Sequence, residues 1–149
     1  MHKLNLEQMV QDLSKSLGDK LISSNDGFFE ILKIEKTELR ALMLKLRDEY
    51  GFNHLANLSS VDYNEEFEVV YHLYSIPAND KVCVKTRVPR NSAEVDSLID
   101  IWPTADWQER EVYDLMGIKF KGHPNLIRVL LPDDFDGHPL RKDFVMGGR

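Results

Sequence analysis

Carboxylate and imidazole side chains gather in the last third of the sequence, where acid–base or metal chemistry is the first function to consider. Glu109 and Glu111 could form a general acid–base pair. Two residues apart on a helix, however, they point in different directions and cannot act on one substrate. A glycosidase-like pair of carboxylates is therefore disfavoured.

An aspartate-rich segment near the end invites a calcium interpretation. With Gly137 at the sixth position of an EF-hand loop, Pro132 takes the first position, where a carboxylate is needed, and Asp143 the twelfth, where glutamate is usual. His123 and His138 could bind a transition metal with these aspartates, but His-Pro and Asp-Gly are also ordinary turn dipeptides. The sequence has no P-loop, GxGxxG, HExxH or GxSxG motif. We therefore predict neither a catalytic centre nor a metal site in this chain.

The composition is that of an ordinary globular domain. The chain has 149 residues, of which 42% are hydrophobic and 30% charged, with a net charge of −6; this fits one domain with a substantial core. Lys and Arg do not form patches with aromatic residues, so no nucleic acid partner is expected. Cys83 is the only cysteine, which excludes an internal disulfide and an iron–sulfur cluster held by this chain alone. No apolar run is long enough to cross a membrane, so membrane contact is expected only through partners.

Hydrophobic periodicity and turn residues predict the elements that must position these side chains. The predicted helices are 6–17, capped by Asn5; 38–50, capped by Thr37; 93–102, capped by Ser92; and 106–117, opened by a capping box of Asp106 and Glu109. The predicted strands are 20–24 and 28–34, joined by an Asn25–Gly27 turn, then 54–62, 67–73 and 81–88. The order α-β-β-α-β-β-β-α-α predicts an α+β fold, a two-layer domain with a mixed sheet over residues 1–120.

An extended C-terminal arm is predicted to follow at residues 121–149. It carries both His-Pro dipeptides and has no helix or strand pattern. Irregular segments of this length are usually functional or bound to a partner, so we expect something outside the chain to order the arm. On the preceding helix, Arg110 is expected to pair with Asp106 and Asp114, each four residues away.

A composite motif with fixed spacing runs from the last predicted helix through the arm. It consists of Glu109-Arg110-Glu111-x-x-Asp114-Leu115-Met116-Gly117-Ile118, Phe120, Gly122-His123-Pro124, Leu126, Arg128, Leu130-Leu131-Pro132, Asp134-Phe135 and Gly137-His138-Pro139-Leu140-Arg141-Lys142-Asp143-Phe144. This motif resembles the signature of the 30 kDa subunit family of respiratory complex I (NADH:quinone oxidoreductase). It departs at Val145, where the family usually has proline. Energy-converting hydrogenases and ferredoxin-linked membrane complexes carry similar chains, so the motif leaves the electron donor open.

The resemblance implies a non-catalytic peripheral-arm subunit of a proton-translocating NADH:quinone oxidoreductase. It implies a peripheral location on the cytoplasmic side of the cell membrane or on the equivalent face of an organelle membrane. It implies no cofactor in this chain, with FMN, iron–sulfur clusters and quinone bound by partner subunits. The expected partners are chiefly the subunit that frames the quinone site and the subunit that bears the terminal cluster. The last helix and the arm would form the interface, with Glu109, Arg110, Glu111 and Asp114 in ion pairs across subunits. The interface residues so implied are Trp107, Glu109, Arg110, Glu111, Asp114, His123, Pro124, Arg128, Asp134, Phe135, His138, Pro139, Arg141, Lys142, Asp143 and Phe144.

Overall fold

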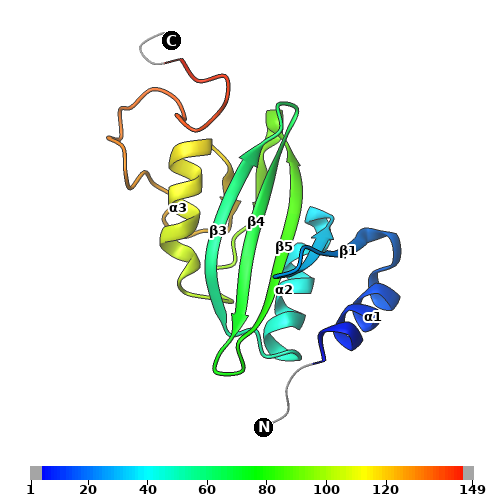
Figure 1. Cartoon of the computed structure of the whole chain (residues 1–149). Coiled ribbons are helices and arrows are strands. Elements are labelled where there is room, and N and C mark those ends of the chain that lie inside the picture. The colour runs from blue at the N-terminus through cyan, green and yellow to red at the C-terminus, as the bar shows by residue number, and fades with distance from the viewer. Residues whose placement is uncertain (1–4, 146–149) are drawn as a thin grey trace.

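Five strands form a mixed sheet at the centre of the molecule (Figure 1). The computed structural model describes residues 5–145, so residues 1–4 of the predicted domain and 146–149 of the predicted arm lie outside it. The strands are β1 (Leu21–Asn25), β2 (Glu30–Ile34), β3 (His54–Asp62), β4 (Glu66–Ser75) and β5 (Asp80–Pro89), in the order β1-β2-β5-β4-β3. β2 and β5 are parallel, and the other neighbouring pairs are antiparallel. The predicted α+β class with a mixed sheet is confirmed.

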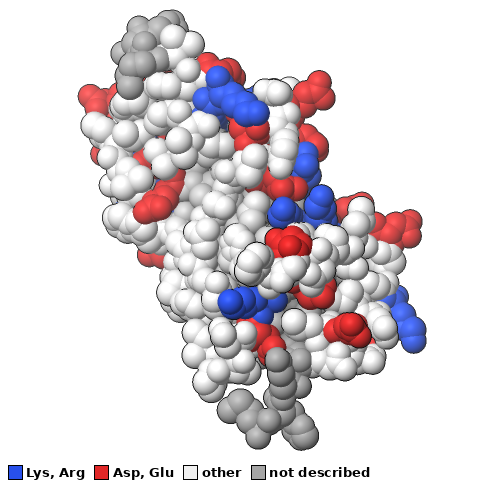
Figure 2. All heavy atoms as spheres, viewed as in Figure 1, with Lys and Arg blue, Asp and Glu red and all other residues white. Residues whose placement is uncertain are grey.

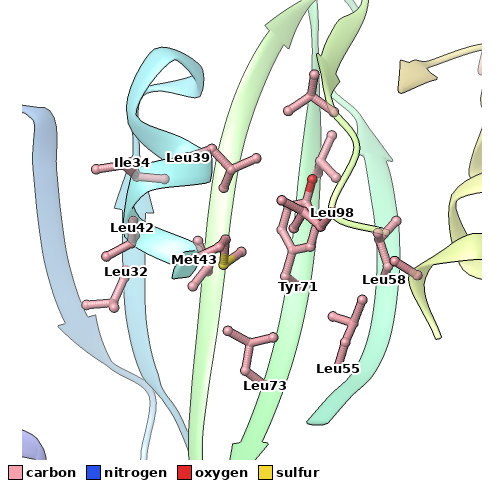
Figure 3. Close-up of a cluster of buried hydrophobic side chains, with 14 of the residues drawn as sticks. Leu32, Ile34, Leu39, Leu42, Met43, Leu55, Leu58, Tyr71, Leu73 and Leu98 are labelled. Atoms are coloured by element: carbon pink, nitrogen blue, oxygen red, sulfur yellow. The ribbon is translucent and has the colours of Figure 1, made fainter. Parts of the chain in front are cut away.

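The three helices of residues 5–145 pack their apolar sides into one core with the sheet. They are α1 (Leu6–Leu17), α2 (Leu39–Asp48) and α3 (Ala105–Met116). Apolar side chains alternate along the strands, and those on one face meet the buried leucines and methionine of α2, as Figure 3 shows around Tyr71. The alternate strand positions, among them Lys33, Lys85 and Arg87, lie on the opposite face, which none of these helices covers.

Caps and turns that depend only on neighbouring residues in the sequence were mostly predicted correctly. Asn5 caps α1, because its side chain accepts a hydrogen bond of 3.1 Å from the backbone N–H of Gln8. The turn after Asn25 joins β1 and β2 as an antiparallel hairpin. Thr37 was predicted wrongly as a cap: a 3₁₀ turn at Lys36–Glu38 precedes α2, whose N-cap residue Glu38 makes no side-chain capping bond.

The predicted helix at residues 93–102 was wrong. A 3₁₀ turn at Arg90–Ser92 leads into a short strand, β6 (Glu94–Asp96), which pairs in parallel with β7 (Lys119–Lys121). Of the apolar residues that suggested a helical stripe, Val95, Leu98 and Trp102 are buried nevertheless, and Ile99 is partly buried. The Trp102 indole N–H donates to the Phe52 carbonyl at 3.0 Å. Tertiary pairing with β7 has therefore overridden a local helical pattern.

Candidate functional site

Two carboxylates of α3 are completely buried, although both were expected at a solvated or subunit-facing surface. Glu109 and Asp114 each have 0% of their surface exposed. Five residues apart on the helix, they point to different sides, Glu109 toward residues 97–98 and Asp114 toward the arm. The expectation that these two side chains form ion pairs with another subunit is therefore corrected: both are bonded within this chain.

Glu109 forms hydrogen bonds to Ser97 and Leu98, which lie in the irregular segment found where a helix was predicted. Its Oε1 accepts a hydrogen bond from the Ser97 hydroxyl at 2.6 Å, and its Oε2 accepts one from the Leu98 N–H at 2.8 Å. The predicted capping box of Asp106 and Glu109 was accordingly wrong, since α3 begins at Ala105 and has no side-chain cap. Burial raises the pKa of Glu109 to about 7, and the two hydrogen bonds offset only part of that effect.

Asp114 binds the start of the ordered arm through both carboxylate oxygens. Oδ2 accepts hydrogen bonds from the N–H groups of three successive residues, Val129, Leu130 and Leu131, at 3.1, 2.8 and 3.0 Å. Oδ1 lies 2.7 Å from Nη1 of Arg128. Burial alone would raise the pKa of Asp114, but these N–H groups and the guanidinium outweigh burial and lower it. The ionised carboxylate is thus the anchor around which the arm folds.

Arg128 connects the two halves of the arm. Its Nη2 donates to the Gly137 carbonyl at 2.9 Å, while its guanidinium lies over the Phe135 ring, 5.7 Å from the ring centre. Phe135 in turn stacks with Phe144, with ring centres 6.0 Å apart. The guanidinium of Arg128 therefore contacts both halves of the arm.

The second half of the arm binds the C-terminal carbonyls of α3, which have no partner inside the helix. The Asp114 carbonyl lies 2.9 Å from Nδ1 of His138, the Leu115 carbonyl accepts from the Leu140 N–H at 2.9 Å, and the Met116 carbonyl accepts from Nε of Arg141 at 2.6 Å. Burial lowers the pKa of His138. Figure 1 shows the arm lying over this end of α3. The chain itself orders the arm, contrary to the expectation that an external partner does so.

Gly117 allows this close approach, which leads to a first prediction. Its φ is +74°, and a Cβ there would lie 2.6 Å from Nη2 of Arg141 and 2.7 Å from Cδ2 of His138. Gly117→Ala should therefore combine left-handed backbone strain with displacement of the arm. Gly51→Ala is the matched control, since Gly51 has φ +76° and open space around the added Cβ. We expect the control to lose about 1 kcal/mol of unfolding free energy, and Gly117→Ala at least about twice as much, by urea titration; equal losses would contradict this packing.

The arm also reaches β3 through a cluster that the sequence did not indicate. The buried carboxylate of Asp62 pairs with Arg90 and accepts the Lys142 N–H at 2.8 Å, and Arg90 lies 3.3 Å from Asp143. Burial raises the pKa of Asp62, but Arg90 and the N–H groups of Lys142 and Asn64 outweigh it and lower the pKa to about 2. No local pattern marks these residues, because Arg90 and Lys142 lie 28 and 80 positions from Asp62 in the chain.

Arg110 does not make the predicted pairs with Asp106 and Asp114. Its guanidinium lies 5.2 Å from the centre of the Trp107 ring, and the Trp107 indole N–H donates to Glu111 at 2.6 Å. Asp106 instead lies 3.0 Å from Nε2 of His123, and Asp114 is paired with Arg128. The four-residue spacing does place these side chains on one side of the helix, but both aspartates pair with residues of the arm instead of with Arg110.

The residues weighed as metal ligands are not brought together. His123 and His138 lie against the carbonyls of Asp106 and Asp114, eight residues apart along α3. Within residues 5–145, no group of three or more His, Cys, Asp or Glu side chains is arranged to hold a metal ion. The chemistry that these side chains perform in the described chain is hydrogen bonding between a helix and its arm.

The fold and site together define an α+β domain whose last helix carries a long irregular arm fastened by buried side chains. The model of the family described as "Respiratory-chain NADH dehydrogenase, 30 Kd subunit" matches residues 32–149, and the chain belongs to this family. This confirms the resemblance seen in the motif.

Curated relatives agree over most of their length. The chain is 46% identical to a NADH-quinone oxidoreductase subunit of Moorella thermoacetica over 142 residues, covering 93% of this chain and 95% of that one. It is 44% identical to the subunit of the same name from Citrifermentans bemidjiense, covering 93% of this chain and 89% of the relative.

Solved structures share the fold. The trypsin-resistant fragment (1-134) of Nqo5 superposes with a TM-score of 0.74 and 29% identity, covering 83% of this chain and all of the fragment. A chain of the membrane-bound sulfane sulfur reductase, an archaeal respiratory membrane complex, superposes with a TM-score of 0.81 and 25% identity, covering 94% of this chain and 85% of that one.

Proposed function

We propose that this chain is a non-catalytic scaffold subunit of a proton-translocating NADH:quinone oxidoreductase, and that it uses α3 and the arm to bind the subunit that frames the quinone site. FMN, the iron–sulfur clusters and quinone belong to partner subunits in this proposal, and the terminal-cluster subunit is a further neighbour. Family membership supports the assignment to the complex.

The surface assigned to the interface rests on the large apolar side chains that the fastened arm and α3 expose. They are Trp107, Ile127, Leu130, Leu140 and Val145. An irregular segment that exposed these side chains while mobile would lose much of its binding free energy in becoming ordered. Because Asp114 and Arg128 already fix the arm, that ordering cost is met within the chain. Exposed apolar groups on a preordered surface are typical of a protein interface.

The remaining motif residues divide into two groups under this proposal. Those whose side chains fasten the arm or its neighbouring segments to α3 are Glu109, Asp114, His123, Arg128, His138 and Arg141. Those that are at least partly exposed and available to a neighbouring subunit are Trp107, Arg110, Glu111, Pro124, Asp134, Phe135, Pro139, Lys142, Asp143 and Phe144.

Membrane attachment is proposed to be indirect and on the cytoplasmic side, through the partner subunits. Within residues 5–145, no helix has the length and apolarity that a membrane crossing requires.

A second candidate is the same scaffold in a membrane complex with another electron donor, such as an energy-converting hydrogenase or a ferredoxin-linked complex. The observation that favours it is the superposition on a chain of an archaeal sulfane sulfur reductase complex. Affinity purification of the tagged chain from native membranes in mild detergent distinguishes the two. Co-purification of a flavin-bearing NADH module with NADH:quinone activity supports the first candidate, and its absence from an intact membrane complex supports the second.

The interface itself is tested by Leu140→Asp. Leu140 is 60% exposed, and it is the backbone N–H of this residue that bonds to α3. We expect the free energy of unfolding of the isolated chain to change by less than about 0.5 kcal/mol, while recovery of the assembled complex falls about tenfold or more. Ile76→Asp is the matched control, because Ile76 is 54% exposed in the turn between β4 and β5, away from the arm in Figure 1. Equal recovery with both variants would overturn the interface assignment.

A further inference from the structure

A second surface lies on the open face of the sheet, where β2 ends and β5 continues. The strands pair from Glu30 opposite Val82 to Lys33 opposite Lys85, and β5 then runs on to Pro89 without β2 beside it. Beside this last part of β5, where β2 has ended, lies a groove of about 540 Å³. Figure 2 shows Lys and Arg side chains on this face, with Asp and Glu side chains among them.

Two lysines of this groove lie opposite each other, and the groove is also lined by four acidic residues, Asp19, Glu35, Glu66 and Glu68. Lys33 and Lys85 are direct register partners across β2 and β5, and like charges placed opposite each other destabilise a sheet. Neither forms an ion pair within the described chain. Asp26 lies close enough to interact with Lys85 electrostatically, but its carboxylate bonds to the N–H groups at positions 28 and 29. The neighbouring Arg87, by contrast, is already paired with two glutamates of β4.

The rest of the groove fits an acidic side chain carried on an extended segment. The edge of β5 beyond Lys85 is where such a segment can lie along the sheet, since β2 has ended there. Ile22, 64% exposed on β1, supplies an apolar wall of the same groove.

We propose that this groove receives an acidic side chain, aspartate or glutamate, from a neighbouring subunit. The inference rests on the proposed function, since it needs the chain to lie in a multi-subunit complex. It adds a second docking surface on the side of the sheet that faces away from the core, separate from the arm. The charge of the occupant is what relieves the repulsion between Lys33 and Lys85.

The substitution Lys33→Glu tests the proposal through two effects of opposite sign. In the isolated chain it replaces a like-charge pair with an opposite-charge pair, so the thermal unfolding midpoint should stay the same or rise. In the native complex it should lower retention of the chain about tenfold at physiological salt. Lys15→Glu, on the exposed side of α1, is the control and should not lower retention. Undiminished retention of the Lys33→Glu chain would overturn the proposal.

Zero-length carbodiimide cross-linking of the purified native complex provides a direct readout, because it joins an amine to a carboxylate in contact with it. We expect Lys33 or Lys85 to be joined to an aspartate or glutamate of another subunit. Cross-links from these lysines only to this chain's own acids, with both lysines acetylated as fast in the complex as in the isolated chain, would overturn the second surface but leave the arm interface intact. A chain that is absent from the complex altogether would overturn both.

Discussion

Asp114→Asn should destabilise the isolated chain by about 3–5 kcal/mol and release the arm from α3. The carboxylate, which is not exposed to water, accepts three backbone N–H groups on one oxygen and pairs with Arg128 on the other. An amide offers one acceptor oxygen and turns an NH₂ group toward these donors, so the Arg128 charge or the N–H groups lose their partner. Removing one member of a buried ion pair typically has this cost. Urea unfolding of the purified chain measures it.

Limited trypsin digestion shows whether the arm is the part released. The Arg128 side chain is only 12% exposed in the folded arm, so cleavage after it should be slow in the parent chain. Release should raise that cleavage rate more than about tenfold, since each 1.4 kcal/mol of local stability is a factor of ten. Asp133→Asn, an exposed arm aspartate close in sequence, is the control. A parent-like digestion pattern for Asp114→Asn would refute the anchoring role.

The same residues explain why the sequence predicted the sheet well and the arm poorly. Asn5 and the hairpin turn after Asn25 act on neighbours within a few positions, so their signals can be read locally. The partners of Asp114 are 14 to 17 positions away, and the hydrogen bond from Lys142 to Asp62 spans 80 positions. No periodicity encodes such distances. The motif located these residues, but only the fold reveals that several of them bind the chain to itself.

The false helix at 93–102 has a related cause. Its apolar spacing was real, since Leu98 and Trp102 are buried. What the spacing could not reveal is that β7 supplies a strand partner to β6 and that Glu109 takes the Leu98 N–H as its donor. Once those distant groups satisfy the backbone, the segment no longer needs helical hydrogen bonds to be buried.

The raised pKa of Glu109 leads us to expect that the free energy of unfolding falls as the pH rises toward neutrality. Burial raises its pKa from 4.5 to about 7 in the folded chain, where its hydrogen-bond donors are the neutral groups of Ser97 and Leu98. The folded state therefore holds this proton more tightly than the unfolded state. The resulting stabilisation is complete below pH 4.5 and is lost as pH rises through about 7, a change of about 3 kcal/mol. Asp62 acts in the opposite direction, but only below its ordinary pKa of 3.8, outside this window. Burial lowers the pKa of His72 and of His138, so these two groups act in the opposite direction inside the window, and the contribution of Glu109 must be read as a difference between the parent and a variant.

Glu109→Gln isolates the effect, because the amide resembles a protonated carboxyl in shape and can both donate and accept. The oxygen still accepts the Leu98 N–H, and the NH₂ can donate to the Ser97 oxygen. Urea unfolding at intervals from about pH 4.5 to 8 should show the free energy of unfolding of the parent falling relative to that of the variant by about 3 kcal/mol. At the upper end of this range the variant should then be the more stable of the two. Glu111→Gln, two positions along α3 and only partly buried, should keep the parent's decline. If the Glu109→Gln chain declined as steeply as the parent, the pH dependence would have to originate elsewhere than in the contact between α3 and the segment at Ser97.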